Sequence, residues 1–243
     1  MSRFYVPKEN IKDNKIFIEG QEAKHVASVM RLCQGDKVVV FDGTGKEYTG
    51  FILDINKKRV TVEIVETKIS SKVPVSNITL VQSILKKEKM DYIIEKATEL
   101  GVKEIIPVIT DRTVVVYDEP KKIFRQQRWE KIALSSAKQC GRVDVPKIGD
   151  VVPFAEVIEH IKEYDTCLFA WLSKDTEPLK NAIEQIRTGN VIVFIGPEGD
   201  FTQNEVDMTK QHANVKYVSL GDRVLKGDTA GLYVLSCLNY ELF

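Results

Sequence analysis

The chain has 243 residues, 43% of them hydrophobic, so it is long enough for one large domain or two smaller ones with cores of their own. Its 35 basic residues balance 35 acidic ones, which disfavours a protein that binds nucleic acid over its whole surface but allows a local basic face. No apolar run reaches the length of a membrane span, and the first residues lack the apolar core of a signal peptide, so we expect a cytoplasmic protein with no membrane attachment.

The four cysteines and three histidines are scattered along the chain. No Cys-x-x-Cys pair occurs, and no histidine stands at metal-binding spacing from a cysteine. We therefore expect reduced thiols and no metal site.

Residues 1–72 are predicted to form a small β domain. Gln21–Leu32 has apolar residues at helical spacing and a glycine shortly after its end, which predicts one helix. The next stretches are rich in β-branched residues and joined by short polar turns, which indicates an antiparallel meander or barrel. The predicted strands are Lys37–Phe41, Tyr48–Asp54 and Val60–Val65.

Glu66–Asn77 contains Ser70, Ser71 and Pro74 without apolar periodicity, so we interpret it as the linker between two domains. From 73 to 243, strands and helices alternate, which predicts an α/β domain with a mostly parallel sheet. The expected strands are Ile78–Gln82, Ile105–Ile109, Cys167–Trp171, Val191–Ile195 and Val215–Leu220. The expected helices are Lys87–Leu100, Pro120–Gln139, Pro178–Arg187, one that starts near Thr202, and one that follows Asp228.

The most informative feature is a pair of loops with glycines, Gly196–Thr202 and Gly221–Gly227, each between a strand and a helix. Loops at the carboxyl ends of neighbouring parallel strands usually form a ligand site, so we expect a small-molecule pocket here. Thr202 followed by Glu205 fits a capping box, and Asp228 fits an N-cap for the last helix. Ordinary strand-to-helix turns would leave the same pattern, and the residue types alone do not separate these alternatives.

The two loops strongly resemble the signature of the RsmE family. The matching segments are Ile195-Gly196-Pro197-Glu198-Gly199-Asp200-Phe201-Thr202 and Leu220-Gly221-Asp222-Arg223-Val224-Leu225-Lys226-Gly227-Asp228-Thr229-Ala230. That family comprises SPOUT-class methyltransferases that use S-adenosylmethionine (SAM) to methylate N3 of a uridine in small-subunit (16S) ribosomal RNA. Further resemblance at His25–Arg31, Lys96–Pro107 and Arg128–Pro146 extends it over essentially the whole chain.

The resemblance implies a fold and a set of partners. Residues 73–243 would form an α/β SPOUT methyltransferase domain with a carboxy-terminal trefoil knot, and residues 1–72 a PUA-like β-barrel domain that grips RNA. The partners would be small-subunit ribosomal RNA or the assembled small subunit. A homodimer is implied as well, because the donor sites of SPOUT enzymes lie near a dimer interface.

Backbone groups of the loops suit the adenine, ribose and carboxylate of SAM, since no bulky side chain intervenes. We therefore assign SAM binding to nine loop residues: Gly196, Glu198, Gly199, Leu220, Gly221, Val224, Leu225, Thr229 and Ala230. Trp171, at the end of an earlier strand, is a further candidate for this cleft, with simple core packing as the alternative.

N3 of uridine is a weakly acidic imide nitrogen, so a base, or a cation that stabilises the anion, would assist methylation. Arg223, Lys226 and Asp228 lie next to the donor loops and are the catalytic candidates. We hypothesise that Lys226 or Arg223 stabilises the developing anion while Asp228 orients the base or the loop. The alternative for Asp228 is a helix cap alone.

Seven polar residues are candidates for contact with RNA through the family resemblance: Arg3, Arg31, Lys86, Lys89, Arg112, Gln139 and Arg142. Each basic residue fits an exposed, solubilising charge as well. Lys86 and Lys89 stand at the start of a predicted helix, where positive charge opposes the helix dipole, which hints at another purpose.

Three positions depart from the family pattern: Asp200 replaces a usual second glycine, Lys226 a usual arginine, and Asp228 a usual glutamate. Lysine lacks the bidentate contacts of arginine, so these changes bear on specificity or rate rather than on the fold. Two rival functions are a SPOUT enzyme acting on another RNA position and a non-catalytic RNA-binding protein. A Rossmann dehydrogenase and a serine hydrolase are disfavoured, because no Gly-x-Gly-x-x-Gly follows a strand and no Gly-x-Ser-x-Gly occurs.

Overall fold

The computed structural model describes residues 3–69, 76–115 and 117–242. These residues fall into two compact units. The first holds the described residues up to 69 together with Ala137–Val145, and the second holds those from 76 to 136 and from 146 to 242. Both ends of the predicted linker belong to strands, while residues 70–75, with the predicted boundary between 72 and 73, lie outside the described residues.

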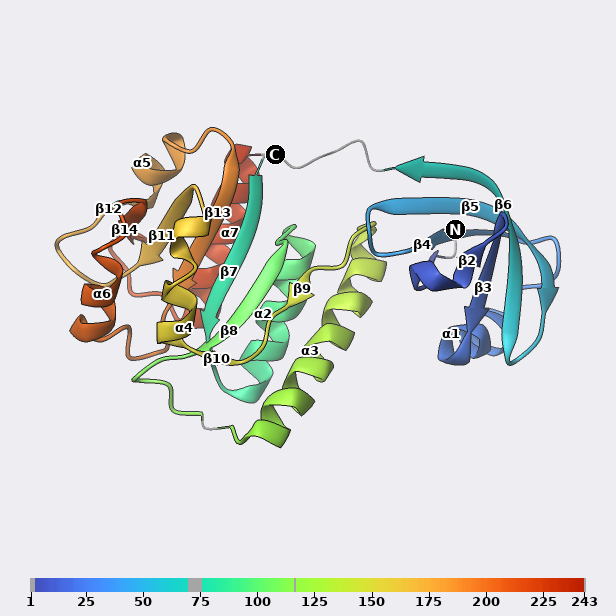
Figure 1. Cartoon of the computed structure of the whole chain (residues 1–243), viewed down its shortest axis with the longest axis horizontal. Coiled ribbons are helices and arrows are strands. Elements are labelled where there is room, and N and C mark those ends of the chain that lie inside the picture. Colours follow the sequence, from blue (N-terminus) through green and yellow to red (C-terminus); the bar gives the residue numbers. More distant parts are fainter. Residues whose placement is uncertain (1–2, 70–75, 116, 243) are drawn as a thin grey trace. The chain divides into compact units, whose positions relative to one another are not determined.

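The first unit is a six-stranded sheet with the strand order β1-β4-β5-β6-β3-β2 (Figure 1). Its strands are β1 (Arg3–Tyr5), β2 (Ile11–Lys12), β3 (Lys15–Glu19), β4 (Lys37–Phe41), β5 (Lys46–Ile55) and β6 (Arg59–Ile69), with a 3-10 turn at Lys8–Asn10. Apart from β1 with β4, neighbouring strands pair antiparallel, which confirms the predicted character of this part.

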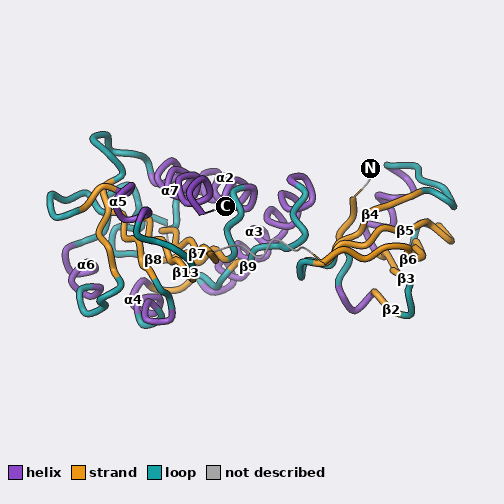
Figure 2. The backbone as a smooth tube through the Cα atoms, turned by 90° about the horizontal axis from the view of Figure 1, so that it is seen from above, coloured by secondary structure: helices purple, strands orange, loops and turns teal. Residues whose placement is uncertain are grey.

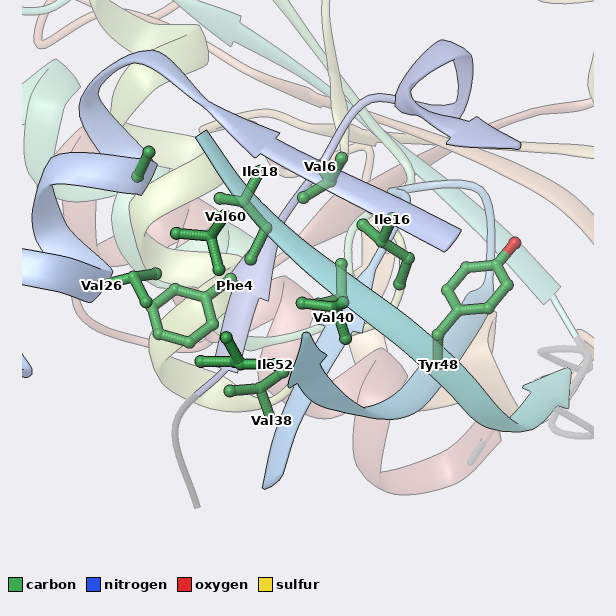
Figure 3. Packing of buried hydrophobic residues seen from close by; sticks show 12 residues of the cluster. Phe4, Val6, Ile16, Ile18, Val26, Val38, Val40, Tyr48, Ile52 and Val60 are labelled. Atoms are coloured by element: carbon green, nitrogen blue, oxygen red, sulfur yellow. The ribbon is translucent and has the colours of Figure 1, made fainter. Parts of the chain in front are cut away.

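Irregularities in the long strand β5 let this sheet curl around one core. The pairing of β5 with β6 shifts register between Thr49 and Gly50, and a Cβ at Gly50 would lie 2.3 Å from the carbonyl oxygen of Glu63. Such bulges bend a strand and increase its twist. The enclosed side chains are shown in Figure 3 and are Phe4, Val6, Ile16, Ile18, Ala23, Val26, Val38, Val40, Tyr48, Ile52, Val60 and Val62.

The helix predicted over Gln21–Leu32 is shorter than expected. Helix α1 (Gly20–Lys24) continues as a single π-helical turn, η2 (His25–Val29), in which the Met30 N–H donates to the His25 carbonyl at 2.9 Å. Arg31 then adopts the left-handed conformation, with φ of 52°. A left-handed residue cannot continue a right-handed helix, so the prediction was wrong at this end although the apolar spacing runs on to Cys33.

The second unit is an eight-stranded sheet with the order β10-β8-β7-β13-β11-β14-β12 and β9 paired to β8. The strands are β7 (Ser76–Ser83), β8 (Glu104–Ile109), β9 (Lys147–Ile148), β10 (Val152–Pro153), β11 (Thr166–Ala170), β12 (Glu177–Pro178), β13 (Gly189–Ile195) and β14 (Val215–Ser219). All their pairings are parallel, which confirms the predicted α/β sheet.

Helices cover both faces of this sheet (Figure 2). They are α2 (Lys87–Glu99), α3 (Glu119–Cys140), α4 (Phe154–Ile158), α5 (Leu179–Glu184), α6 (Gln203–Thr209) and α7 (Gly227–Leu242), with a 3-10 turn at Ile161–Glu163. Helices α2 and α7 pack together on one face, and α4 and α6 on the other. The α4 face has an aromatic core made of Phe154, Phe169, Phe194 and Phe201.

The larger predicted elements match the observed ones to within a few residues, apart from the helix that ends early at Lys24. The strands β1, β2, β3, β9, β10 and β12 and the helix α4 were not predicted. The trefoil knot stays a prediction. None of the described helices is long and apolar enough to span a membrane. Within the described ranges, no group of three or more His, Cys, Asp or Glu side chains is arranged to hold a metal ion.

Candidate active site

An open cleft lies where β11, β13 and β14 end, bordered by both glycine loops. It contains about 550 Å³ of empty space, a volume that includes open solvent, so the site is a shallow cleft and not an enclosed cavity. Its lining residues are Ala170, Trp171, Leu172, Ile195, Gly196, Pro197, Glu198, Asp200, Val218, Leu220, Gly221, Arg223, Val224, Leu225, Gly227 and Ala230.

The first loop, residues 196–202, is anchored at its end by α6. The Thr202 hydroxyl accepts from the Glu205 N–H at 3.3 Å, and the Glu205 carboxylate accepts from the Thr202 N–H at 2.8 Å. This reciprocal pair is the predicted capping box, now confirmed. The other oxygen of Glu205 accepts from the Asp111 N–H at 2.9 Å, so a side chain that is 3% exposed also holds the loop after β8.

Further contacts hold the same loop from two sides. The Arg112 guanidinium donates to the carbonyl oxygen of Gly199 at 2.5 Å and lies 3.4 Å from that of Phe201. The Phe201 ring is 2% exposed, and its centroid lies 4.4 Å from that of Phe169. Burying an aromatic ring stabilises a fold by about 2–3 kcal/mol, so Phe201 fastens the loop to the core.

Helix α7 approaches the first loop closely at Gly227. A Cβ at this position would lie 3.1 Å from the carbonyl oxygen of Gly196 and 3.2 Å from Leu85. Because α7 begins at Gly227, the residue before it, Lys226, holds the N-cap position, and Asp228 lies within the first turn, so the predicted N-cap was wrong by two residues. Its carboxylate still lies at the positive end of the helix dipole.

The second loop, residues 220–226, is held by few contacts. The Gly221 N–H donates to the Ser219 hydroxyl at 3.3 Å, and the Lys226 carbonyl accepts from the Ala230 N–H at 2.8 Å. Val224 is 73% exposed. Arg223 and Lys226 are exposed too, and neither side chain has a hydrogen-bond or ion-pair partner in the part of the chain that the structure describes.

Lys89 connects the first loop with the start of α7. Its Nζ atom lies 3.1 Å from Oε1 of Glu198 and 3.9 Å from Oδ1 of Asp228. Burial acts to raise the pKa of Glu198, but its backbone hydrogen bond and the cations Lys89 and Lys86 outweigh burial, so this pKa lies below its usual value. Oδ1 of Asp228 is buried without a hydrogen bond to the described residues, and Lys89 is the cation near it.

Seven of the nine residues assigned to SAM binding line the cleft, while Gly199 and Thr229 do not. Trp171 also lines the cleft, and its ring makes an edge contact with Tyr217. Trp171 therefore both borders the cleft and packs against the core. Of the catalytic candidates, Arg223 borders the cleft, whereas Lys226 and Asp228 lie next to lining residues. Seven lining residues were missed. Three lie at strand ends, where an apolar run signals only burial, namely Ala170, Ile195 and Val218, and four lie in loops or at the start of α7, namely Leu172, Pro197, Asp200 and Gly227.

The RNA-binding candidates differ in what their side chains contact. Arg31, Lys86 and Gln139 are exposed. Four others contact the protein itself, and for two of them, Lys89 and Arg112, the partners are cleft groups described above.

Arg3 and Arg142 bind within the first unit. The Arg3 guanidinium pairs with Glu47 at 2.5 Å, donates to the Arg142 carbonyl at 2.6 Å and lies over the Phe41 ring. Arg142 pairs with Asp144 at 2.8 Å. The bond from Arg3 joins Ala137–Val145 to β1, and the Arg142–Asp144 pair lies within that segment. The sequence did not indicate these structural roles.

Comparison with known proteins adds independent findings. A family model described as RNA methyltransferase domain matches residues 71–239, and one described as RNA methyltransferase PUA domain matches residues 18–65. The chain is 30% identical over 250 residues to ribosomal RNA small subunit methyltransferase E of Bacillus subtilis (strain 168), covering 99% of this chain and 97% of that protein.

Solved structures are similar over the same length. A ribosomal RNA small subunit methyltransferase E from Neisseria gonorrhoeae, bound to S-adenosyl methionine, superposes with a TM-score of 0.86 at 28% identity and covers 99% of this chain and 97% of that one. A putative methyltransferase from Legionella pneumophila, in complex with the cofactor SAM, gives 0.86 at 31% identity, with 98% and 96% covered.

Proposed function

This chain belongs to the RNA methyltransferase family of ribosomal RNA small subunit methyltransferase E, and on that premise we propose that it uses SAM to methylate N3 of a uridine in small-subunit ribosomal RNA. The single observation that carries the proposal is the cleft between the two glycine loops, at the carboxyl ends of parallel strands. Most of its lining residues come from the two segments that resemble the family signature.

The residues of the cleft suit SAM. Gly196 lines the cleft with backbone alone, and the loop folds back closely on it, because a Cβ there would lie 3.2 Å from both Asp200 and Phe201. Leu220, Val224 and Leu225 supply apolar surface for an adenine ring. When bound, SAM supplies an electrophilic methyl group on its sulfonium. The backbone of both loops would hold its adenine, ribose and carboxylate, and the open side of the cleft would admit the nucleotide.

The second loop supplies the charges that the reaction needs. N3 of uridine must lose its proton, and a cation close to the base stabilises the anion that results. Arg223 is the first candidate because it borders the cleft and its guanidinium has no partner among the described residues; Lys226 is the second. Asp228, held near Lys89, orients the start of α7.

The RNA partner is small-subunit ribosomal RNA, free or within the subunit, and the reaction belongs in the cytoplasm. Arg31, Lys86 and Gln139 are exposed and suit contact with phosphate or sugar. Arg3, Lys89, Arg112 and Arg142 already bind protein groups, so their main contribution is to hold the surface that presents the others.

The enzyme acts as a homodimer in this proposal. The outer faces of α5 and α7 form an apolar groove with Tyr233 and with Tyr240, which is 84% exposed. Exposed aromatic residues around a groove are typical of interfaces. A single subunit mass in solution, measured by light scattering at micromolar concentration, would remove this part of the proposal.

The test is to titrate SAM by calorimetry and then to follow transfer of a labelled methyl group to ribosomal RNA and to isolated small subunits. We expect binding of SAM and label recovered as 3-methyluridine. Binding with label in another nucleoside, or in transfer RNA only, would favour a methyltransferase of different specificity. Absence of SAM binding would favour a non-catalytic RNA-binding protein.

A further inference from the structure

Asp200 occupies a backbone conformation that disfavours side chains. Its φ is 60°, in the left-handed region, where glycine is usual and where the resemblance also places a glycine. Aspartate tolerates this region when its short side chain forms local hydrogen bonds. Hydrogen bonds of the Asp200 carboxylate are therefore expected to offset the cost of this conformation.

That carboxylate accepts two backbone hydrogen bonds from different loops. Oδ1 accepts from the adjacent Phe201 N–H at 2.8 Å, and Oδ2 accepts from the Leu172 N–H at 2.9 Å. The first bond is local. The second joins the first glycine loop to the segment that follows β11.

The second bond holds the chain just beyond the end of the β11–β13 pairing. The β11–β13 ladder ends at Phe169 and Phe194, so no strand pairing on that side reaches Leu172. On the other side, Trp171 donates to the Val218 carbonyl at 3.2 Å. The segment Ala170–Leu172 is thus held between β14 and the Asp200 carboxylate, and all three of its residues line the cleft.

We propose that Asp200 is a positioning residue that fixes Ala170–Leu172 as a preformed wall of the cleft and thereby strengthens SAM binding. The inference rests on the proposed function for the identity of the ligand. Preorganisation raises affinity because less conformational freedom is lost on binding. Gly196 lets the Asp200 carboxylate take this position, since a Cβ at residue 196 would lie 3.2 Å from Oδ1 of Asp200.

Two substitutions separate the tie to Leu172 from relief of backbone strain. Asp200→Gly removes both hydrogen bonds but suits the positive φ, so the fold is retained. Asp200→Asn keeps the shape but has one acceptor oxygen for two N–H donors. Asp13→Gly is a matched control, because Asp13 has a φ of 50° in an exposed turn of the first unit.

Two measurements are made on each full-length variant: hydrogen exchange at the Leu172 amide without ligand, and SAM affinity by calorimetry. For Asp200→Gly we expect loss of Leu172 protection and roughly tenfold weaker SAM binding, the effect of losing one hydrogen bond to a charged group. Asp200→Asn should fall between this variant and the wild type. Asp13→Gly should match the wild type in both measurements.

Unchanged protection of Leu172 in Asp200→Gly would overturn the tie. Lost protection with SAM affinity within about twofold of the wild type would overturn the effect on binding. If the wild-type protein itself fails to bind SAM, the proposed function fails and the role in SAM binding falls with it. Leu172 exchange, which needs no ligand, then still decides whether the tie exists.

Discussion

The two loops that border the cleft are built in opposite ways. Residues 196–202 are fixed by a capping box, by Arg112, by the buried Phe201 ring and by the Asp200 carboxylate. Residues 220–226 have little beyond hydrogen bonds at their two ends, and Val224 is largely exposed. The cleft therefore combines a preformed wall with an open one, and a segment with few contacts is the one that a ligand can order.

This contrast suggests a division of labour. The first loop shapes the pocket, and its polar side chains, Glu198, Asp200 and Thr202, are occupied by bonds within the protein. The second loop carries Arg223 and Lys226, cations without partners among the described residues. Substitution of the residues that brace the first loop should reduce stability together with binding, whereas substitution of Arg223 or Lys226 should change the reaction and leave stability unchanged.

The largest expected effect concerns the second loop. Arg223→Ala should lower kcat about 100-fold, the usual effect of losing one group that stabilises an anionic transition state. Lys226→Ala should lower it about tenfold, since Lys226 does not border the cleft. The melting temperature should not move, because both side chains are exposed. Methyl transfer under saturating SAM measures the effect, and Arg187→Ala, an exposed arginine beyond α5, is the control. Full kcat in both variants would remove their catalytic role.

The next largest effect is a loss of stability when the contacts that hold residues 196–202 are removed. Glu205→Ala should reduce the free energy of unfolding by about 2 kcal/mol, because the part-buried N–H groups of Thr202 and Asp111 lose their acceptor. Asp207→Ala, on the exposed side of the same helix, should change it by less than about 0.5 kcal/mol. Urea denaturation measures both. Equal losses in the two variants would mean that the first loop is not braced in this way.

The contact between α7 and the first loop should give a smaller change. Gly227→Ala should reduce the free energy of unfolding by about 1 kcal/mol and weaken SAM binding several-fold, since its Cβ meets a backbone oxygen that has little room to move. Gly149→Ala is the control, because a Cβ there would meet its nearest neighbour at 3.4 Å. A more stable Gly227→Ala variant would show that α7 does not press on Gly196.

The smallest effect is a pH dependence at Glu198. Burial alone would raise the pKa of Glu198, but its backbone bond, Lys89 and Lys86 keep that pKa below its usual value of 4.5. A lowered pKa stabilises the folded state above pH 4.5, and this contribution is lost as pH falls through the folded-state pKa. Glu198→Gln should therefore make the free energy of unfolding depend slightly less on pH below 4.5. The effect is small because the Lys89–Glu198 pair is partly exposed to solvent. An unchanged acid profile would count against the pairing with Lys89.

Features that depend on residues close together in the sequence were predicted better than contacts between residues far apart in it. The capping box at Thr202 and Glu205 was predictable because both partners lie within one turn. Helix α4 was missed because an element of five residues has no readable period. The helix end at Arg31 was missed because a left-handed residue other than glycine leaves no mark in the apolar spacing.

The candidate site shows the same division. The loops were predictable as a pair, since each glycine segment follows a strand. The partners of Arg112 and Lys89 were not, because they are separated from these residues by 87 and 109 positions, and sequence spacing says nothing about such pairs. Both side chains are candidates for contact with RNA through the family resemblance, and the structure shows that they also bind the first loop.

The most direct test of the cleft assignment is hydrogen exchange of the full chain with and without SAM. SAM should strongly protect the amides of residues 220–226, which have few bonds without it. Protection of residues 197–201 should change little, because contacts within the protein already hold that loop. Protection confined to a surface outside both loops, or no change at all, would contradict the account.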